Sequence, residues 1–198
     1  MRLRKVLIIG IAILIGGCST VSNSETVVWY FQVAAPQRYE VWVEHLELEA
    51  SGVRHWRQAP GIVSCCWQGE GGPRGKGGRM EPFPDYIGIE WFSYAEQVFY
   101  QRLVSLPEEW KEHMLELAPQ KNAHGEVYKP RNTLVLGLAP GGEIVIWIKN
   151  QLGNEIEIAR LQANKIDGDA SNYQSRSRDY LERHGEYLKK HGIPLEGW

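Results

Sequence analysis

The strongest constraint on the fold of this chain is a long apolar hairpin in its second half. Residues 132–138 and 143–149 are rich in aliphatic side chains, and the turn 139–142, Ala-Pro-Gly-Gly, separates them. Such a pair predicts two antiparallel strands joined by a tight turn. The second strand is apolar on both faces over 144–148, which places it inside a sheet rather than at an edge. The hairpin therefore predicts a β-rich fold with a buried central sheet.

Other segments predict the remaining strands of the first half. Residues 27–33 are apolar on both faces and predict a buried strand, and 62–67 predict a short one. From Tyr39 onward apolar and polar residues alternate, but the phase shifts at Glu44-His45. A long strand with a β-bulge at that point explains the shift.

Further strands are predicted after residue 85. Residues 86–92 predict a strand, and 155–161 predict a half-polar strand near a sheet edge. For 94–106 two patterns compete, because Ser93 and Glu96 have the spacing of a helix capping box whereas the later residues repeat every second position. We favour strand, turn, strand for this segment. Both helix and strand remain open from the sequence.

Two segments predict helices. Pro107, followed by Glu108-Glu109, is typical of a helix start, and Trp110, Met114 and Leu117 then recur at helical spacing until Pro119. Near the end of the chain, a polar helix runs through Lys190 and stops at Gly192. Its expected buried residues are Tyr180, Leu181, Tyr187 and Leu188. The fold class predicted is α+β: mostly antiparallel β-sheet, sandwich-like, with a mid-chain helix and a C-terminal helix.

The N-terminal residues predict export and a lipid anchor. Arg2, Arg4 and Lys5 precede the apolar run 6–15, which is about half of the ~20 residues needed to span a bilayer. The run closes with Ile-Gly-Gly-Cys, and this ending resembles the lipobox of bacterial lipoproteins. That resemblance implies acylation of Cys18, with Ser19 as a sorting residue that directs the protein to the outer membrane, facing the periplasm. The domains expected are a signal peptide 1–17, a lipidated Cys and tether 18–26, and a single α+β periplasmic domain 27–198.

Charge and cysteine content narrow the partners and the redox chemistry. Removal of residues 1–17 takes the formal net charge from −2 to −5, which argues against nucleic acid as a partner. The cysteines that remain besides Cys18 are the adjacent Cys65 and Cys66. In an oxidising compartment they form either a strained vicinal disulfide or a pair of thiols, and we favour the thiols because a vicinal bridge distorts the backbone.

One segment combines glycine with positive charge. Residues 69–79 contain six glycines together with Arg74, Lys76 and Arg79. We interpret this run as a flexible surface loop that does not pack, with the three cations as candidate partner-binding residues. A solvated hairpin tip that binds nothing is the alternative interpretation.

Motifs of catalysis and metal binding are missing. The glycine run lacks the spacing of a P-loop, no serine lies in Gly-x-Ser-x-Gly, and the histidines form no metal-binding pair. Asp167-Gly168-Asp169 begins like a calcium loop, but Arg178 occupies the twelfth position. Glu90 is the one carboxylate on an apolar strand, and Arg102 on the facing strand is its guessed partner. We therefore expect no enzymatic activity, no cofactor and no metal.

Several aromatic and turn motifs resemble a known family. They are Cys-Cys-Trp at 65–67, Pro-Asp-Tyr-Ile-Gly-Ile-Glu-Trp-Phe-Ser at 84–93, Leu-Val-Ser-Leu-Pro at 103–107, Leu-Gly-Leu-Ala-Pro-Gly-Gly at 136–142 and Gly-Ile-Pro at 192–194. In this order they resemble a bacterial lipoprotein family of unknown function, the domain of unknown function 2931. The resemblance spans nearly the whole mature chain and implies no catalytic residues.

Two functions remain open at this stage. Lipoproteins similar to this one lie, in some genomes, beside type VI secretion lipase effectors, which implies an immunity protein that binds and neutralises a phospholipase. The alternative is an envelope housekeeping lipoprotein that binds peptidoglycan or another glycan through exposed aromatic rings, since the chain has eight Trp and nine Tyr.

Overall fold

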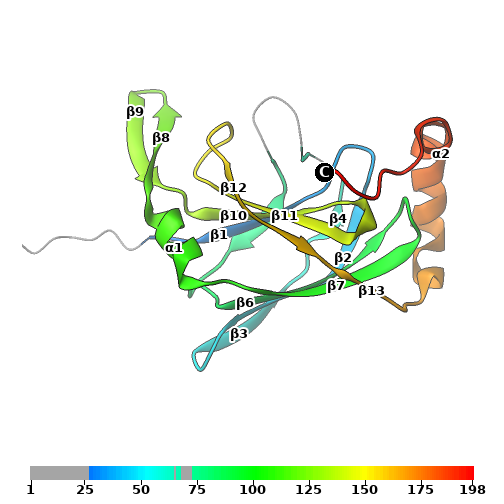
Figure 1. Ribbon diagram of the computed structural model, residues 1–198, viewed down its shortest axis with the longest axis horizontal. Coiled ribbons are helices and arrows are strands. Elements are labelled where there is room, and N and C mark those ends of the chain that lie inside the picture. Colours follow the sequence, from blue (N-terminus) through cyan, green and yellow to red (C-terminus); the bar gives the residue numbers. More distant parts are fainter. Residues whose placement is uncertain (1–26, 65, 68–72) are drawn as a thin grey trace, which may run out of the picture.

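The computed structural model describes residues 27–64, 66–67 and 73–198, which form two packed β-sheets, a projecting two-stranded ribbon and two α-helices (Figure 1). The five-stranded sheet A contains, in spatial order, β12 (Ile156–Gln162), β11 (Glu143–Lys149), β10 (Thr133–Leu138), β1 (Tyr30–Ala34) and β5 (Lys76–Arg79). The six-stranded sheet B contains β13 (Asn164–Ile166), β7 (Val98–Ser105), β6 (Tyr86–Ser93), β2 (Val41–Ala50) and β3 (Arg54–Gln58), and β4 (Gly61–Val63) also pairs with β2.

The remaining elements lie outside the two sheets. The ribbon consists of β8 (Leu117–Asn122) and β9 (Gly125–Pro130); the helices are α1 (Glu108–Leu115), α2 (Gln174–His191) and the short 3₁₀ turns η1 (Pro140–Gly142) and η2 (Ala170–Tyr173). All pairings given between strands are antiparallel except that of β1 with β10. The predicted α+β sandwich class is confirmed.

The main core lies between the sheets and joins their inner faces. Phe31 and Leu136 of sheet A share it with Leu46, Ile89 and Trp91 of sheet B, and all five side chains are buried. The inward residues alternate with outward ones along each strand, as the period-two patterns predicted. Burial of these faces supplies the hydrophobic free energy that holds the sandwich together.

The hairpin that dominates the sequence is confirmed as β10 and β11. Leu138 pairs with Ile144 next to the turn, and β11 lies between β10 and β12, so it is an interior strand as its two apolar faces predicted. The 155–161 segment forms the edge strand β12, also as predicted. The turn uses Gly141 and Gly142 with φ of 79° and 80°, a region that favours glycine.

The ambiguous segment after β6 is a strand. β7 pairs along its full length with β6, which confirms strand, turn, strand. The capping-box side chains nevertheless interact as that motif would: the Ser93 hydroxyl donates to Glu96 Oε2 over 2.9 Å, and the Glu96 amide donates back over 3.4 Å. The reciprocal bonds stabilise the turn between β6 and β7 without starting a helix.

Both helices differ in detail from the prediction. α1 begins after Pro107 but ends at Leu115, and Leu117, expected on its buried face, instead begins β8 and is 63% exposed. In α2, Tyr180 is buried but Leu181 is 47% exposed, so the buried face of that helix is narrower than predicted. Similarly, the strand predicted at 62–67 is β4, which ends at Val63. Leu117 and Leu181 are exposed because no other element packs over them, although their spacing predicted burial.

An ion pair between the buried Glu40 and the half-exposed Arg183 fixes α2 to the sheet. Glu40 is 3% exposed, and Arg183 donates to both of its carboxylate oxygens over 2.6 and 3.0 Å. The Tyr180 hydroxyl donates to the Arg38 carbonyl over 2.6 Å. These contacts connect α2 to the residues just before β2. The helix therefore lies over the end of sheet B where β2 begins.

Candidate functional site

The outer face of sheet B is half covered. At one end, α2 and η2 pack against an aromatic cluster of Phe92, Tyr94 and Phe99 with Tyr173 and Tyr180. Toward the other end of the same strands the outward residues become polar, and no helix of the described chain lies over them (Figure 1). We call this uncovered part, centred on Glu44, His45 and Glu90, the open face.

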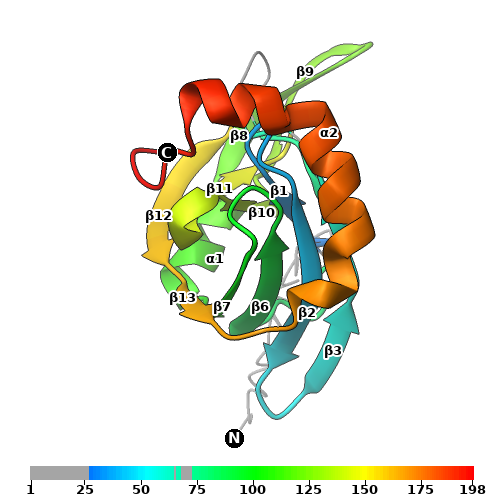
Figure 2. The ribbon, with the colours of Figure 1, turned by 90° about the vertical axis from the view of Figure 1, so that its right-hand side faces the viewer.

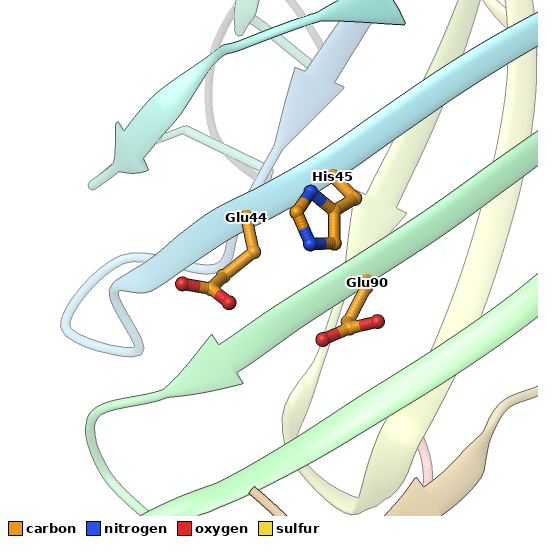
Figure 3. Close-up of side chains that lie close together, drawn as sticks. All are labelled: Glu44, His45 and Glu90. Carbon is orange, nitrogen blue, oxygen red and sulfur yellow. The ribbon is translucent and has the colours of Figure 1, made fainter. Parts of the chain in front are cut away.

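The β-bulge in β2 creates the centre of the open face. In the pairing of β2 with β6, Val43 lies opposite Trp91 and His45 lies opposite Glu90, so Glu44 is the extra residue. The bulge was predicted from the phase shift of the sequence and is confirmed. Its effect is to place Glu44 and His45 together beside Glu90, as Figure 3 shows. β-bulges redirect side chains in this way next to many functional sites.

Neither carboxylate of this cluster forms an ion pair with a cation in the described part of the chain. Gln101 Nε2 donates to Glu90 over 3.2 Å, and the Tyr173 hydroxyl donates to Glu44. Burial, followed by repulsion from Glu44, raises the pKa of Glu90, although the nearby charge of Arg57 acts to lower that pKa. The two acids therefore form a half-buried acceptor pair with unused capacity for a donor.

The three side chains have a spacing that could hold a metal ion, because one ligand atom from each lies within 4.8 Å of the others. The environment of His45 argues against it. Arg57 Nη2 contacts His45 Nδ1, and a guanidinium can only donate, so the imidazole proton belongs on Nε2. His45 then has no lone pair to offer while Arg57 stays in place, and metal-bound histidines instead donate to an acceptor. The arrangement suits an organic cation better than a metal ion.

Beside the cluster lies an open depression of about 390 Å³. Glu90, Gln101 and Leu103 line it, and the Leu103 side chain is 63% exposed. Tyr86, near the other end of β6, is 40% exposed. Exposed apolar groups next to unpaired acceptors are typical of protein-binding surfaces.

The sequence identified only part of this site. Glu90 was singled out, but its guessed partner was wrong: Arg102 pairs in register with Ile89, and Gln101 is the residue opposite Glu90. Glu44 and His45 were recognised as a bulge and not as site residues. The signal that could have found them is the phase shift itself, because it puts an extra outward residue on an otherwise alternating strand.

The three predicted partner-binding cations do not form one patch. Lys76 Nζ donates to the Pro60 carbonyl over 3.3 Å, whereas Arg79 Nη1 lies 3.7 Å from Glu81 Oε2. Both residues belong to β5, where an odd separation puts them on opposite faces. The backbone of Arg74 pairs with that of Cys66.

The prediction that this glycine run does not pack is wrong for residues 76–79, which form the edge strand β5 against β1. A Cβ on Gly77 would lie 1.9 Å from the Phe31 carbonyl oxygen, so glycine is what lets the two backbones approach. Residues 68–72 lie outside the described part of the chain. The run therefore contributes to sheet A and does not provide a single basic loop.

Cys66 is disulfide-bonded, so it is not the thiol that we favoured. Cys65 lies outside the described residues, and so do the lipidation candidate Cys18 and the sorting candidate Ser19. No helix in the described part of the chain is long and apolar enough to cross a membrane.

Comparison with known proteins identifies the family. A family model described as "Protein of unknown function (DUF2931)" matches residues 18–196. The chain belongs to this family. No curated protein and no solved structure matches the chain significantly. Membership of DUF2931 agrees with the resemblance noted in the sequence, and the match covers both sheets, both helices and the open face.

Proposed function

We propose that this DUF2931 protein is a lipid-anchored periplasmic protein of the outer membrane that binds a protein partner and has no catalytic activity. The observation that carries the binding proposal is the open face: two half-buried carboxylates, Glu44 and Glu90, which form no ion pair among the described residues, beside the exposed Leu103. A partner that inserts a lysine or arginine there would satisfy both acids. The depression is open to solvent, which suits docking better than chemistry that must exclude water.

The partner proposed is a phospholipase effector delivered by type VI secretion, which would make this an immunity protein. The lipobox-like ending at Cys18 supports this proposal, because it would hold the protein in the compartment that such effectors attack. The family match also begins at Cys18, the residue that would become the first of the mature chain. The glycan alternative has weaker support: each of the eight tryptophans is buried or half-buried, and the exposed aromatic residues are Tyr86 and Tyr128, which lie on different sheets and form no shared platform for a sugar.

A competition experiment tests the function and the site together. A deletion strain is exposed to attackers that carry the linked effector, and it is complemented with wild type, with the double variant Glu44→Gln and Glu90→Gln, or with Glu186→Gln on the exposed side of α2. Wild type and the α2 control should restore survival, whereas the double variant should not, although it accumulates to the same level. Normal survival of the uncomplemented deletion strain would overturn the immunity proposal. Full protection by the double variant would show that the two carboxylates of the open face are not needed for binding the effector.

A further inference from the structure

Exposed apolar side chains are concentrated at one end of the molecule. Of the eleven large apolar residues exposed in the described chain, six belong to α1, the β8–β9 ribbon or the adjoining β11–β12 segment. They are Leu115, Leu117, Val127, Tyr128, Leu152 and Ile156. The ribbon projects from the body at this end, and α2 lies at the opposite end (Figures 1 and 2). This end therefore differs in chemistry from the rest of the surface.

One face of the ribbon is apolar across both strands. Leu117 lies opposite Pro130, and Pro119 lies opposite Tyr128, so these four residues share a face. Leu117 is 63% exposed and Tyr128 is 60% exposed. Lys121 and Glu126 continue the same face toward the tip. An apolar stripe that ends in charged groups is suited to a boundary between a hydrocarbon layer and water.

The base of the ribbon is firmly held, which matters because an isolated two-stranded ribbon is marginally stable in water. Asn150 Nδ2 donates to the carbonyls of Ala118 and Lys129 over 3.1 and 2.8 Å. Asn154 Nδ2 donates to the Pro119 carbonyl over 2.8 Å, and Gln151 Oε1 accepts from the Lys121 amide over 2.7 Å. The apolar face is thus presented at a fixed position relative to sheet A.

The position of the first described residues indicates what lies against the apolar face of the ribbon. Val27 and Val28, the first described residues, line a cavity together with Gln120 and Pro130 of the ribbon, so the chain enters the domain beside the ribbon base. Only residues 19–26 separate Val27 from Cys18, and the nine residue steps from Cys18 to Val27 span at most about 30 Å even when fully extended. A lipid anchor at Cys18 would keep this end of the molecule next to the bilayer.

We propose that the apolar face of the β8–β9 ribbon rests on the phospholipid surface, with Leu117 and Tyr128 at the boundary between headgroups and acyl chains. This inference rests on the lipid anchor proposed above. The contact orients the domain, because the anchor and the ribbon together fix two points of the same end. α2 then points away from the membrane, and a partner can reach the open face from the periplasm.

Fluorescence quenching in proteoliposomes tests the contact. The full lipidated chain is reconstituted into phosphatidylethanolamine–phosphatidylglycerol vesicles, with and without brominated phosphatidylcholine, as wild type, Tyr128→Trp, Leu117→Trp and the control Leu181→Trp on α2. No native tryptophan is exposed, so the wild-type emission can be subtracted. The brominated lipid should quench and blue-shift the added emission at 128 and 117 and leave that at 181 unchanged.

Each other outcome contradicts the inference in a recognisable way. Vesicle-bound protein with no more quenching at 128 and 117 than at 181 would overturn the ribbon contact and leave the anchor intact. Reporters shielded from both brominated lipid and aqueous acrylamide would show that protein covers the ribbon, which also overturns the inference. Failure of wild-type protein to float with the vesicles would overturn the anchor and the ribbon contact together.

Discussion

At the scale of single residues, Glu90 combines an unfavourable environment with a central position in the open face. Burial and the neighbouring Glu44 raise its pKa, so folding favours the protonated form. Ionised Glu90 therefore lowers stability near neutral pH, and this cost disappears as the pH falls through its raised pKa. Groups that reduce stability in this way are frequent at binding sites, where the partner removes the cost.

We predict that Glu90→Gln keeps or raises the melting temperature near neutral pH while weakening partner binding. The difference in melting temperature between variant and wild type should shrink as the pH is lowered, because wild-type Glu90 then takes up its proton. Thermal unfolding followed by circular dichroism over a pH series measures both effects. Glu49→Gln, on the neighbouring strand β2 and exposed, is the matched control and should show no such trend. A fall of several degrees on Glu90→Gln near neutral pH would show that ionised Glu90 stabilises the fold instead.

At the scale of elements, close packing makes the same substitution act in opposite directions in a strand and in a helix. A Cβ on Gly137 in β10 would lie 2.4 and 2.5 Å from the rings of Trp67 and Trp147. For Gly185 in α2 the nearest atom is at 4.0 Å. The strand position therefore has no room for a methyl group, whereas the helix position has.

We expect Gly137→Ala to lower the free energy of unfolding by roughly 1–3 kcal/mol through overpacking. Gly185→Ala should raise it by about 0.5–1 kcal/mol, because alanine favours the helix. Urea denaturation of the two variants measures both values, and near-UV circular dichroism should change only for Gly137→Ala. Equal effects of the two substitutions would mean that the tryptophan rings move aside at little cost.

At the scale of the whole molecule, the ribbon and α2 lie at opposite ends of the domain, and the first described residues lie beside the ribbon. The open face lies between the ribbon and α2 on sheet B. A membrane anchor at the N-terminal side would leave both the open face and α2 accessible from the periplasm.

We predict that Cys18→Ser leaves an uncleaved or soluble precursor, because the residue that would carry the lipid is gone. Ser19→Asp should keep the anchor and shift the protein toward the inner membrane. Membrane fractionation with immunoblotting distinguishes the two variants by size and by density. Recovery of Cys18→Ser in the outer-membrane fraction at mature size would contradict the lipobox interpretation.

The sequence by itself determined the strands with strong alternation or two apolar faces. The β10–β11 hairpin, the bulged β2 and the edge position of β12 could all be predicted, because each depends on local periodicity and on turn residues. Glu90 was noticed for the same reason, as a charge on an apolar strand. The end of α1 and the buried face of α2 were predicted less well, because the neighbours that cover a helix are not encoded in its spacing.

Only the tertiary structure decided what the glycine run and the bulge do. Glycines 77 and 78 predicted a mobile loop from composition, yet a partner strand makes them part of a sheet, since backbone hydrogen bonds need no side chain. Glu90 is separated from Glu44 and His45 by more than forty positions along the chain, and the register between β2 and β6 brings the three residues together. Periodicity in the sequence predicts the face of the sheet on which a residue lies, but the pairing between distant strands decides which residues are its neighbours. The site depends on such neighbours, because Glu90 comes from a different strand than Glu44 and His45.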